Sequence, residues 1–340
     1  MNILVTGGCG FIGGHFIRTA FSAEGLSQLG FNPIADVLIN LDNLSYAANP
    51  EGLVELDSCA SYHFIQEDIL HEQAILSILE KFHIEAIVHF AAQTHVDRSI
   101  QQVDPFVQTN VLGTLSILKA CQHYLTHAKD IKKRFRMVYV STDEVYGSLA
   151  SSVAPVTETA PLKPSNPYSA SKAAGEHFVQ AWCNTYQIPT IITRCSNNYG
   201  VGQYPEKLIP LMLKQALNEQ ALPIYGNGLQ IRDWIAVEDH CRAINCVLRS
   251  GSVGEIYNIG ANQEVSNIAL VSILCRLLDE YKPRTNQQSY TDLITYIQDR
   301  PGHDQRYALN TQKIRQELAW TPIISLEQGL KNIVLATLDA

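Results

Sequence analysis

The fold of this chain is decided by the stretch Ile3-Leu4-Val5-Thr6-Gly7-Gly8-Cys9-Gly10-Phe11-Ile12-Gly13. A short apolar run precedes a glycine turn and an amphipathic segment, so the pattern predicts a strand, a tight turn and a helix. Glycines at this spacing allow a tight turn, close approach of the backbone to a pyrophosphate, and close packing of helix on strand. Unpaired N–H groups at the helix start favour phosphate. The stretch predicts a dinucleotide site containing Gly7, Gly10, Phe11, Ile12 and Gly13.

Further along, short β-branched runs alternate with amphipathic segments such as the one that places Ile75, Ile78, Leu79 and Phe82 on one stripe. This rhythm predicts an α/β fold with a doubly wound parallel sheet and a second, smaller, interleaved α/β domain. We assign residues 1–194 to the dinucleotide-binding domain, with 230–258 returning to it, and 195–340 mainly to the smaller domain. The expected strands are Ile3–Thr6, Val37–Leu41, Tyr62–Gln66, Ala86–Phe90, Met137–Ser141, Thr190–Arg194 and Ile256–Ile259.

The composition excludes several classes of protein. Of the 340 residues 46% are hydrophobic and 17% charged, which is too apolar for a disordered chain. A formal net charge of −8 argues against nucleic acid or an anionic membrane as a partner. No apolar run reaches the ~18–20 residues that a membrane span needs, and Met1–Gly7 does not resemble a signal peptide. Because the eight cysteines form no Cys-x-x-Cys pair, we expect free thiols, no metal site and a cytoplasmic protein.

The second expected strand ends at Leu41-Asp42-Asn43. A carboxylate there would accept hydrogen bonds from a ribose diol and repel a 2′-phosphate, which favours NAD over NADP. Asp42 lies further from the glycine turn than the usual ~20 residues, and a long connection over 20–35 accounts for the gap. Asp68-Ile69 follows the third strand and would lie beside the adenine or begin a helix.

Tyr168 and Lys172 stand at positions i and i+4, and are therefore neighbours on one helix face. A phenol has a pKa of about 10. A nearby ammonium, helped by a nicotinamide cation, would lower that pKa and make Tyr168 a base. Such a pair also occurs on ordinary surface helices. Together with the glycine turn it indicates the short-chain dehydrogenase/reductase superfamily.

A third motif, Ser141-Thr142-Asp143-Glu144-Val145-Tyr146-Gly147, follows the fifth strand. Open α/β sheets bind their ligands at this end of the strands. Hydride transfer alone needs no pair of acids. Two carboxyl groups whose environments separate their pKa values can act as acid and base, as removal of water from a sugar requires. The alternative is a solvated Asp-Glu turn.

These residues resemble the dTDP-glucose 4,6-dehydratases, extended short-chain dehydrogenases/reductases that act on nucleotide sugars. The resemblance runs from Met1 to about Tyr307, and Thr142-Asp143-Glu144 separates these enzymes from the related epimerases. Further matching segments are Thr94–Ser99, Arg194–Tyr199, Pro205–Pro210, Arg232–Trp234 and Asp299–His303. Gly200–Tyr204, Gln93 and Ile235-Ala236 depart from the common pattern. The resemblance implies an NAD-binding domain followed by a nucleotide-sugar-binding domain.

The resemblance also implies roles. Tyr168 would take the proton from the sugar 4-hydroxyl while C4 gives a hydride to NAD. Glu144 would then remove the C5 proton while Asp143 protonates the departing 6-hydroxyl, and the hydride would return to C6. Thr142 would bind the 4-oxygen, and Lys172 would hold the ribose. Substrate contacts are implied for Thr94, Asn197, Lys207, Arg232, Asn267, Arg300 and His303, and further cofactor contacts for Ala91, Ala92, Thr109 and Asn198.

Three alternatives remain open: a nucleotide-sugar 4-epimerase or decarboxylase, a 4,6-dehydratase acting on a UDP-sugar, and a catalytically silent NAD-sensing or scaffold protein. The resemblance further implies a homodimer, joined through the helix after Asp104 and the helix that carries Tyr168. We expect the first helix to begin at Asp104-Pro105 and to bury Val107, Val111, Leu115 and Leu118. A second apolar side would remain for the partner, formed by Phe106, Ile117, Phe178 and Trp182.

Overall fold

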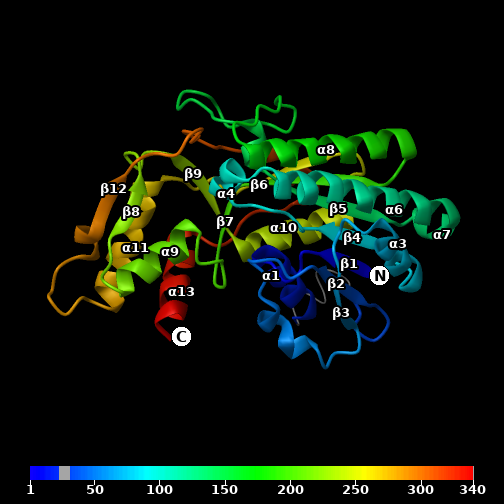
Figure 1. The fold of residues 1–340 in the computed structure, drawn as a ribbon, viewed down its shortest axis with the longest axis horizontal. Helices are drawn as coiled ribbons and strands as arrows, with labels where there is room; N and C mark the ends of the chain where they lie inside the picture. The colour runs from blue at the N-terminus through cyan, green and yellow to red at the C-terminus, as the bar shows by residue number, and fades with distance from the viewer. Residues whose placement is uncertain (23–30, 340) are drawn as a thin grey trace.

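A computed structural model describes residues 1–22 and 31–339 of the chain. Its centre is a seven-stranded parallel sheet with the strand order β10-β6-β5-β4-β1-β2-β3 (Figure 1). From β1 the chain continues to β2 and β3 at one edge of the sheet, and from β4 it continues to β5 and β6 towards the other edge. The strand order therefore reverses between β1 and β4, which is where such sheets bind their ligands. The strands are β1 (Ile3–Thr6), β2 (Leu38–Asp42), β3 (Tyr62–Gln66), β4 (Ala86–His89), β5 (Arg136–Thr142), β6 (Thr190–Cys195) and β10 (Ile256–Ile259).

Helices cover both faces of this sheet. The side chains of α1 (Phe11–Phe21) and α10 (Val237–Ser250) bury one face. Those of α3 (Glu72–Lys81), α6 (Thr114–His127) and α8 (Pro167–Tyr186) bury the other, and Figure 1 shows α6 and α8 side by side above the sheet. Shorter elements on this half are η1 (Pro50–Leu56), α4 (Val96–Gln101), α5 (Asp104–Phe106), η2 (Val107–Gly113), α7 (Lys129–Lys132) and η3 (Asp143–Tyr146).

The second half has its own core, formed by helices α9, α11 and α13 with two small sheets. One sheet has the order β11-β9-β7, and the other pairs β12 with β8. In Figure 1 this half lies to the left of the large sheet and contains the C-terminus. Its elements are β7 (Asn197–Tyr199), α9 (Leu208–Leu217), β8 (Leu222–Tyr225), β9 (Ile231–Ala236), β11 (Glu264–Ser266), α11 (Asn267–Tyr281), η4 (Tyr290–Leu293), β12 (Ile294–Ile297) and α13 (Leu326–Asp339).

Late segments of the chain return to the large sheet. The strand expected at Ile256–Ile259 is confirmed, because β10 pairs in parallel with β6. Helix α12 (Gln312–Leu318) lies nearby, and Ile314 and Trp320 share a core with Ile3 and Val5 of the first strand. Within the return segment 230–258, however, β9 pairs with β7 and β11 of the small sheet instead of the large one. The other six expected strands are present, with ends that differ by at most one residue.

The helix expected after Asp104 differs from its prediction because residues Val107–Gly113 form a π-helical segment. The wider turn shifts the 3.6-residue periodicity. Val107, which we expected to be buried, is 40% exposed, whereas Leu118 is buried as expected. Phe106 and Ile117, expected to face a partner, also lie in the core. Helix α5 begins at Asp104 itself, with Val103 as the N-cap. Phe178 and Trp182 of α8 are half-buried.

The stripe Ile75, Ile78, Leu79 and Phe82 packs against the core as predicted. The connection expected over 20–35 contains the end of α1, and its residues 23–30 lie outside the described residues. Across residues 1–22 and 31–339, no helix has the length and apolar character that crossing a membrane would require.

Candidate active site

The glycine turn brings β1, α1 and β4 into close contact. Gly7 has a φ of +73°, and a Cβ there would lie 2.6 Å from the backbone nitrogen of Ala91. A Cβ on Gly13 would lie 2.3 Å from the carbonyl oxygen of Gly7. Both positions therefore require glycine, since a side chain would collide with backbone atoms. Gly10 is the N-cap of α1 and has no capping side chain.

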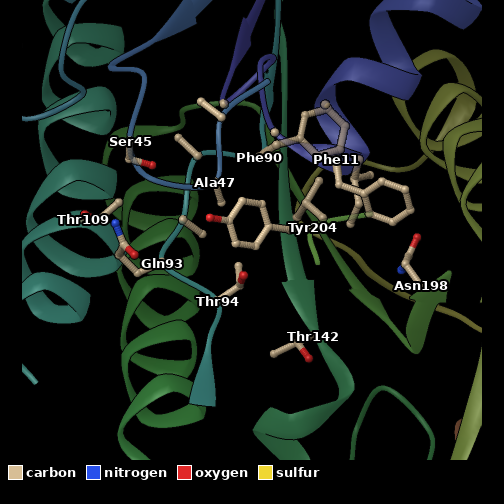
Figure 2. A pocket seen from close by; sticks show the side chains of 18 of the residues that line it. Phe11, Ser45, Ala47, Phe90, Gln93, Thr94, Thr109, Thr142, Asn198 and Tyr204 are labelled. Atoms are coloured by element: carbon tan, nitrogen blue, oxygen red, sulfur yellow. The ribbon is translucent and has the colours of Figure 1, made fainter. Parts of the chain in front are cut away.

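A cavity of about 300 Å³ opens over this turn, at the carboxyl ends of the central strands (Figure 2). It brings together most of the residues that we predicted. These are Gly7, Gly10, Phe11, Ile12, Gly13, Asp42, Asn43, Ile69, Ala91, Ala92, Thr94, Thr109, Thr142, Glu144, Tyr168, Lys172, Asn197, Asn198 and Lys207. Six predicted residues do not line it: Asp68, Asp143, Arg232, Asn267, Arg300 and His303.

Asp42 ends β2 on the cavity wall and is buried. One carboxylate oxygen accepts from the N–H of Cys9 at 3.0 Å, and the other from the N–H of Leu44 at 2.8 Å. Burial raises its pKa, and these two hydrogen bonds oppose the rise. Asp68 instead accepts from the side chain of Asn43 at 3.0 Å and from the N–H of Leu70 at 2.9 Å, and the following helix has His71 as its N-cap. The expectation that Asp68 begins a helix is therefore wrong, whereas its place beside the adenine stays a prediction.

Tyr168 and Lys172 lie in the first two turns of α8, and both side chains are buried. Burial raises the pKa of Tyr168 well above its usual range, and Glu144 adds to this effect, whereas a hydrogen bond with Thr142 opposes it. Burial lowers the pKa of Lys172 to about 8. The protein alone therefore holds Tyr168 as the phenol, and the phenolate that we expected requires a further positive charge beside it.

Asp143 and Glu144 begin the short helix η3 directly after β5, in different surroundings. Glu144 lines the cavity and accepts a hydrogen bond from the side chain of Asn166 at 3.3 Å. Burial raises its pKa, while Arg232, Arg300 and Lys207 pull it down. Burial raises the pKa of Asp143 much further, and Glu144 and then Asp233 strengthen the rise. Burial thus raises the pKa of both acids, and that of Asp143 more strongly, while the nearby cations act on Glu144.

The predicted basic residues surround Glu144 even where they do not line the cavity. The Arg232 guanidinium donates to the carbonyls of Ile231 and Asp304, and its Cζ lies 4.2 Å from the centroid of the Tyr307 ring. Arg300 pairs with Asp97 at 3.1 Å. The Lys207 ammonium donates to the carbonyl of Thr94 at 3.2 Å.

His303 and Asn267 complete the set of predicted substrate residues. His303 hydrogen-bonds Asp299 at 2.6 Å, and burial lowers its pKa. Asn267 is the first residue of α11, and its N–H donates to the carbonyl of Gln230 at 3.0 Å. Nothing in the described contacts brings the Asn267 side chain to the cavity.

Sequence reasoning missed a group of residues that closes the cavity from the outside. Tyr46 follows β2, and its hydroxyl donates to Glu206 at 2.9 Å, while the Arg98 guanidinium donates to the same carboxylate at 3.2 Å and lies 3.7 Å from the centroid of the Tyr46 ring. Figure 2 shows the Tyr204 ring projecting into the cavity, and the centroids of the Tyr204 and Tyr46 rings lie 5.5 Å apart in an edge-to-face arrangement. We call Tyr46, Arg98, Tyr204 and Glu206 the clasp. The departure at Gly200–Tyr204 was the signal that could have found it.

Asn166 was also missed, because Pro164–Pro167 looked like a structural turn. Its side-chain oxygen caps α8 by accepting from the N–H of Ser169 at 2.9 Å, and its amide nitrogen contacts Glu144. One residue thus joins the start of the catalytic helix to a candidate base.

Comparison with known proteins gives one consistent result. A family profile described as GDP-mannose 4,6 dehydratase matches residues 4–333. The dTDP-glucose 4,6-dehydratase of Haemophilus influenzae is 49% identical, over 98% of this chain and 97% of that protein. The crystal structure of DesIV, a dTDP-glucose 4,6-dehydratase from Streptomyces venezuelae with NAD and TDP bound, superposes with a TM-score of 0.89 at 40% identity, over 100% of this chain and 97% of that one. A UDP-glucose 4-epimerase from Thermotoga maritima reaches a TM-score of 0.84 at 26% identity, over 100% and 99%.

Proposed function

This chain belongs to the dTDP-glucose 4,6-dehydratases, and we propose that it converts dTDP-glucose to dTDP-4-keto-6-deoxyglucose with the residues assembled at the cavity. The reaction is an NAD-dependent hydro-lyase reaction: oxidation at C4, loss of water across C5 and C6, and reduction at C6. The observation that carries the proposal is the pair Asp143 and Glu144, two adjacent acids in unlike surroundings beside Tyr168. An epimerase on this fold has no use for such a pair.

The cavity suits NAD in three respects. Gly7 and Gly13 leave room for a close backbone approach, the N-terminus of α1 faces the cavity for the pyrophosphate, and Asp42 places a carboxylate where a ribose diol would lie. When bound, NAD takes the hydride from C4 and later returns it to C6, so that it leaves the cycle unchanged. Its nicotinamide is also the positive charge that Tyr168 lacks in the protein alone.

In the first stage Tyr168 takes the proton of the sugar 4-hydroxyl. Thr142 hydrogen-bonds the phenol and is placed to bind the same sugar oxygen. Lys172 contributes an ammonium beside the ribose and the phenol. Because all three side chains are buried, water does not compete for these hydrogen bonds.

In the second stage the 4-ketone makes the C5 hydrogen acidic. Glu144, which has donors and cations around it, removes that proton, and Asp143 gives its own proton to the departing 6-hydroxyl, which leaves as water. The C5 position then regains a proton as hydride reaches C6. Over one cycle Tyr168 gains a proton and Asp143 loses one. The Thr142 hydroxyl, which lies 3.4 Å from Asp143, is next to both groups.

The nucleotide diphosphate would be held by Lys207, Arg232 and Arg300. Guanidinium groups offer planar forks to phosphate oxygens, and an ammonium offers a point charge. Arg300 is engaged by Asp97 in this structure, so substrate would take over one of its hydrogen bonds. Asn197, His303 and Asn267 are further candidates for this half of the substrate.

The decisive assay incubates the protein with dTDP-glucose and follows the alkaline absorbance of the 4-keto product together with the loss of one water by mass spectrometry. Formation of a galactose sugar instead would overturn the proposal. UDP-glucose in parallel tests the nucleotide preference. The Asp143→Asn variant should still oxidise C4 and release little water, whereas Tyr168→Phe should lose both steps. Unchanged turnover in Asp143→Asn would remove Asp143 from the reaction.

We propose that the protein is a homodimer that uses the outer side of α4 to η2 together with α8. Ile100, Val103, Val107 and Leu112 expose between 38% and 46% of their surface there. Beside them α8 presents small residues, Ala170, Ala174 and Ala181, which allow close helix contact. Light scattering should give a dimer that Leu112→Glu dissociates. A wild-type monomer at micromolar concentration would contradict the assignment.

We further propose that residues 1–194, joined by α10 and β10, form the cofactor-binding half, and that most of 195–340 binds the nucleotide sugar. A cytoplasmic location is the remaining part of the proposal. It is supported by the eight cysteines, all of which are free thiols.

A further inference from the structure

Three buried polar side chains lie in one row beside the cavity, Asp143, Ser196 and Asp233. Ser196 is a hydrogen-bond partner of Asp233, whereas Asp143 Oδ2 has no such partner among the described residues. The strand register explains the row. Thr142 of β5 pairs with Cys195 of β6, so the next residues are Asp143 and Ser196. Asn197 of β7 pairs with Trp234 of β9, so the preceding residues are Ser196 and Asp233. Ser196 is therefore flanked by one aspartate on each side.

Gly260 confirms how closely these groups are packed. A Cβ at that position would lie 2.4 Å from Asp233 Oδ2 and 3.5 Å from Ser196 Oγ. The glycine therefore leaves the space that the carboxyl group of Asp233 needs next to the serine. All three polar side chains are at least 97% buried, so bulk water does not screen the charge of one from the other.

The other end of Asp233 is fixed by the loop after β10. Its Oδ1 accepts from the N–H of Gln263 at 2.7 Å, and the N–H groups of Asn262 and Ala261 add hydrogen bonds to the same carboxyl group. Backbone N–H donors stabilise a carboxylate. Asp143 has the opposite surroundings: among the described residues its Oδ1 accepts from the Thr142 hydroxyl alone, and its Oδ2 meets no donor.

The charged and titratable groups that face Asp143 come from several elements. Glu144 follows it on η3, Asp233 and Arg232 lie on β9, and Cys195 ends β6. Tyr146 and Tyr307 line a small void against it. Arg232 is the one cation in this set of described residues, and its guanidinium already donates to two carbonyls. Burial raises the pKa of Asp233 as well, but the pKa of Asp143 is raised further.

We propose that Asp233 is a positioning residue of the water-elimination step: held as a carboxylate by the loop 261–263 and separated from Asp143 by Ser196, it obliges Asp143 to carry the proton that the 6-hydroxyl needs. Asp233 touches neither sugar nor cofactor and acts through Asp143 alone. The assignment rests on the proposed function.

The test is Asp233→Asn, which keeps the shape of the side chain and an acceptor for Gln263 but removes the charge. Asp143 then loses its proton more easily, so the alkaline limb of the kcat–pH profile for water loss should move down by about one pH unit. Oxidation at C4, followed in a single turnover by reduction of the cofactor, should keep its own pH profile. Asp239→Asn is the matched control, because Asp239 is equally buried and accepts from the N–H groups of Ile323 and Ile324.

A substrate analogue with fluorine in place of the 6-hydroxyl shows which group causes the alkaline limb of the pH profile. Fluoride departs without a proton, so the limb that belongs to Asp143 should disappear for wild type and Asp233→Asn alike. A lower kcat with an unmoved alkaline limb would show that Asp233 is merely structural and would overturn the inference. Absence of any 4-keto-6-deoxy product with the wild-type enzyme would instead refute the proposed function.

A direct titration avoids dependence on the folding of Asp233→Asn. In wild-type protein labelled with ¹³C at the aspartate carboxyl carbons, the signal that is missing in Asp143→Asn should have the shift of a protonated acid at pH 7. An ionised signal at that pH would overturn the inference.

Discussion

The ammonium of Lys172 donates a hydrogen bond to the main-chain carbonyl of Val140, with 2.8 Å between Nζ and the oxygen. It also lies 4.2 Å from the centroid of the Tyr139 ring. The lysine is thus anchored on β5, one helical turn from the phenol it serves. Keeping this cation buried has a cost, because burial lowers the pKa of Lys172 to about 8.

Lys172→Met should remove that cost along with the activity. An unfolded lysine has a pKa of about 10.4, so between pH 8 and 10 the unfolded wild-type chain binds more protons than the folded one. Wild-type stability should therefore rise with pH in this window, by about 2 kcal/mol relative to Lys172→Met. Urea unfolding at several pH values measures the difference. A constant difference would show that Lys172 is not a buried cation.

Asp42→Asn should weaken NAD binding about 10- to 100-fold, because the ribose would lose a charge-assisted acceptor. Affinity for NADP should fall less or rise, since the repulsion of a 2′-phosphate is relieved. Calorimetric titration of protein freed of nucleotide measures both affinities. Asp130→Asn is the control, as Asp130 is exposed and lies outside the cavity lining. Equal effects of the two substitutions would refute the selective role of Asp42.

Arg98→Gln and Tyr46→Phe should open the clasp and speed the release of NAD several-fold. Each change removes a hydrogen bond to Glu206 that joins the two halves of the molecule over the cavity. The cofactor content after gel filtration is the measurement. Arg134→Gln, which removes an exposed ion pair with Glu85, should retain as much NAD as the wild type. If all three variants retain NAD equally, the clasp does not hold the cofactor.

Glu176→Gln should destabilise the fold by about 3 kcal/mol or more, because it leaves the Arg194 guanidinium buried without its charge partner. The pair is bidentate, with distances of 2.7 Å to 3.1 Å, and both side chains are at most 3% exposed. The double variant Glu176→Met with Arg194→Met should lose less stability than the sum of the losses in the single variants Glu176→Met and Arg194→Met. Denaturant unfolding completes the cycle, and simple additivity would contradict a coupled pair.

Much of the large sheet could be predicted because buried parallel strands are apolar along most of their length, as in Ile3–Val5 and Ala86–Val88. The cavity wall was also predictable, since glycine spacing and residues at strand ends follow from chain geometry. The π-helical segment Val107–Gly113 was not. It widens the turn without a compositional signal, and Val107 at its start is exposed, whereas Leu118 further along the chain is buried as predicted.

The clasp and the row formed by Asp143, Ser196 and Asp233 escaped prediction for another reason. The members of the row lie far apart in the chain, and the pairing of β5 with β6 and of β7 with β9 brings them together. The clasp instead depends on how the two halves pack, since Tyr46 and Arg98 of one half meet Glu206 of the other. The residues within a strand do not show which other strand it will pair with or in which register. Asp68 shows the opposite case. Its position after the third strand was noted from the sequence, but in the structure it forms hydrogen bonds with Asn43 and Leu70 and does not line the cavity.

The core that unites Ile3 and Val5 with Ile314 and Trp320 has a consequence for biosynthesis. A ribosome delivers the first strand more than two hundred residues before α10, which shares this core with it. During most of translation the nascent chain exposes the apolar surface that α10, β10 and α12 later cover, and chaperones would have to shield it. Truncation before Val237 should for the same reason leave one face of the sheet that carries the glycine turn uncovered.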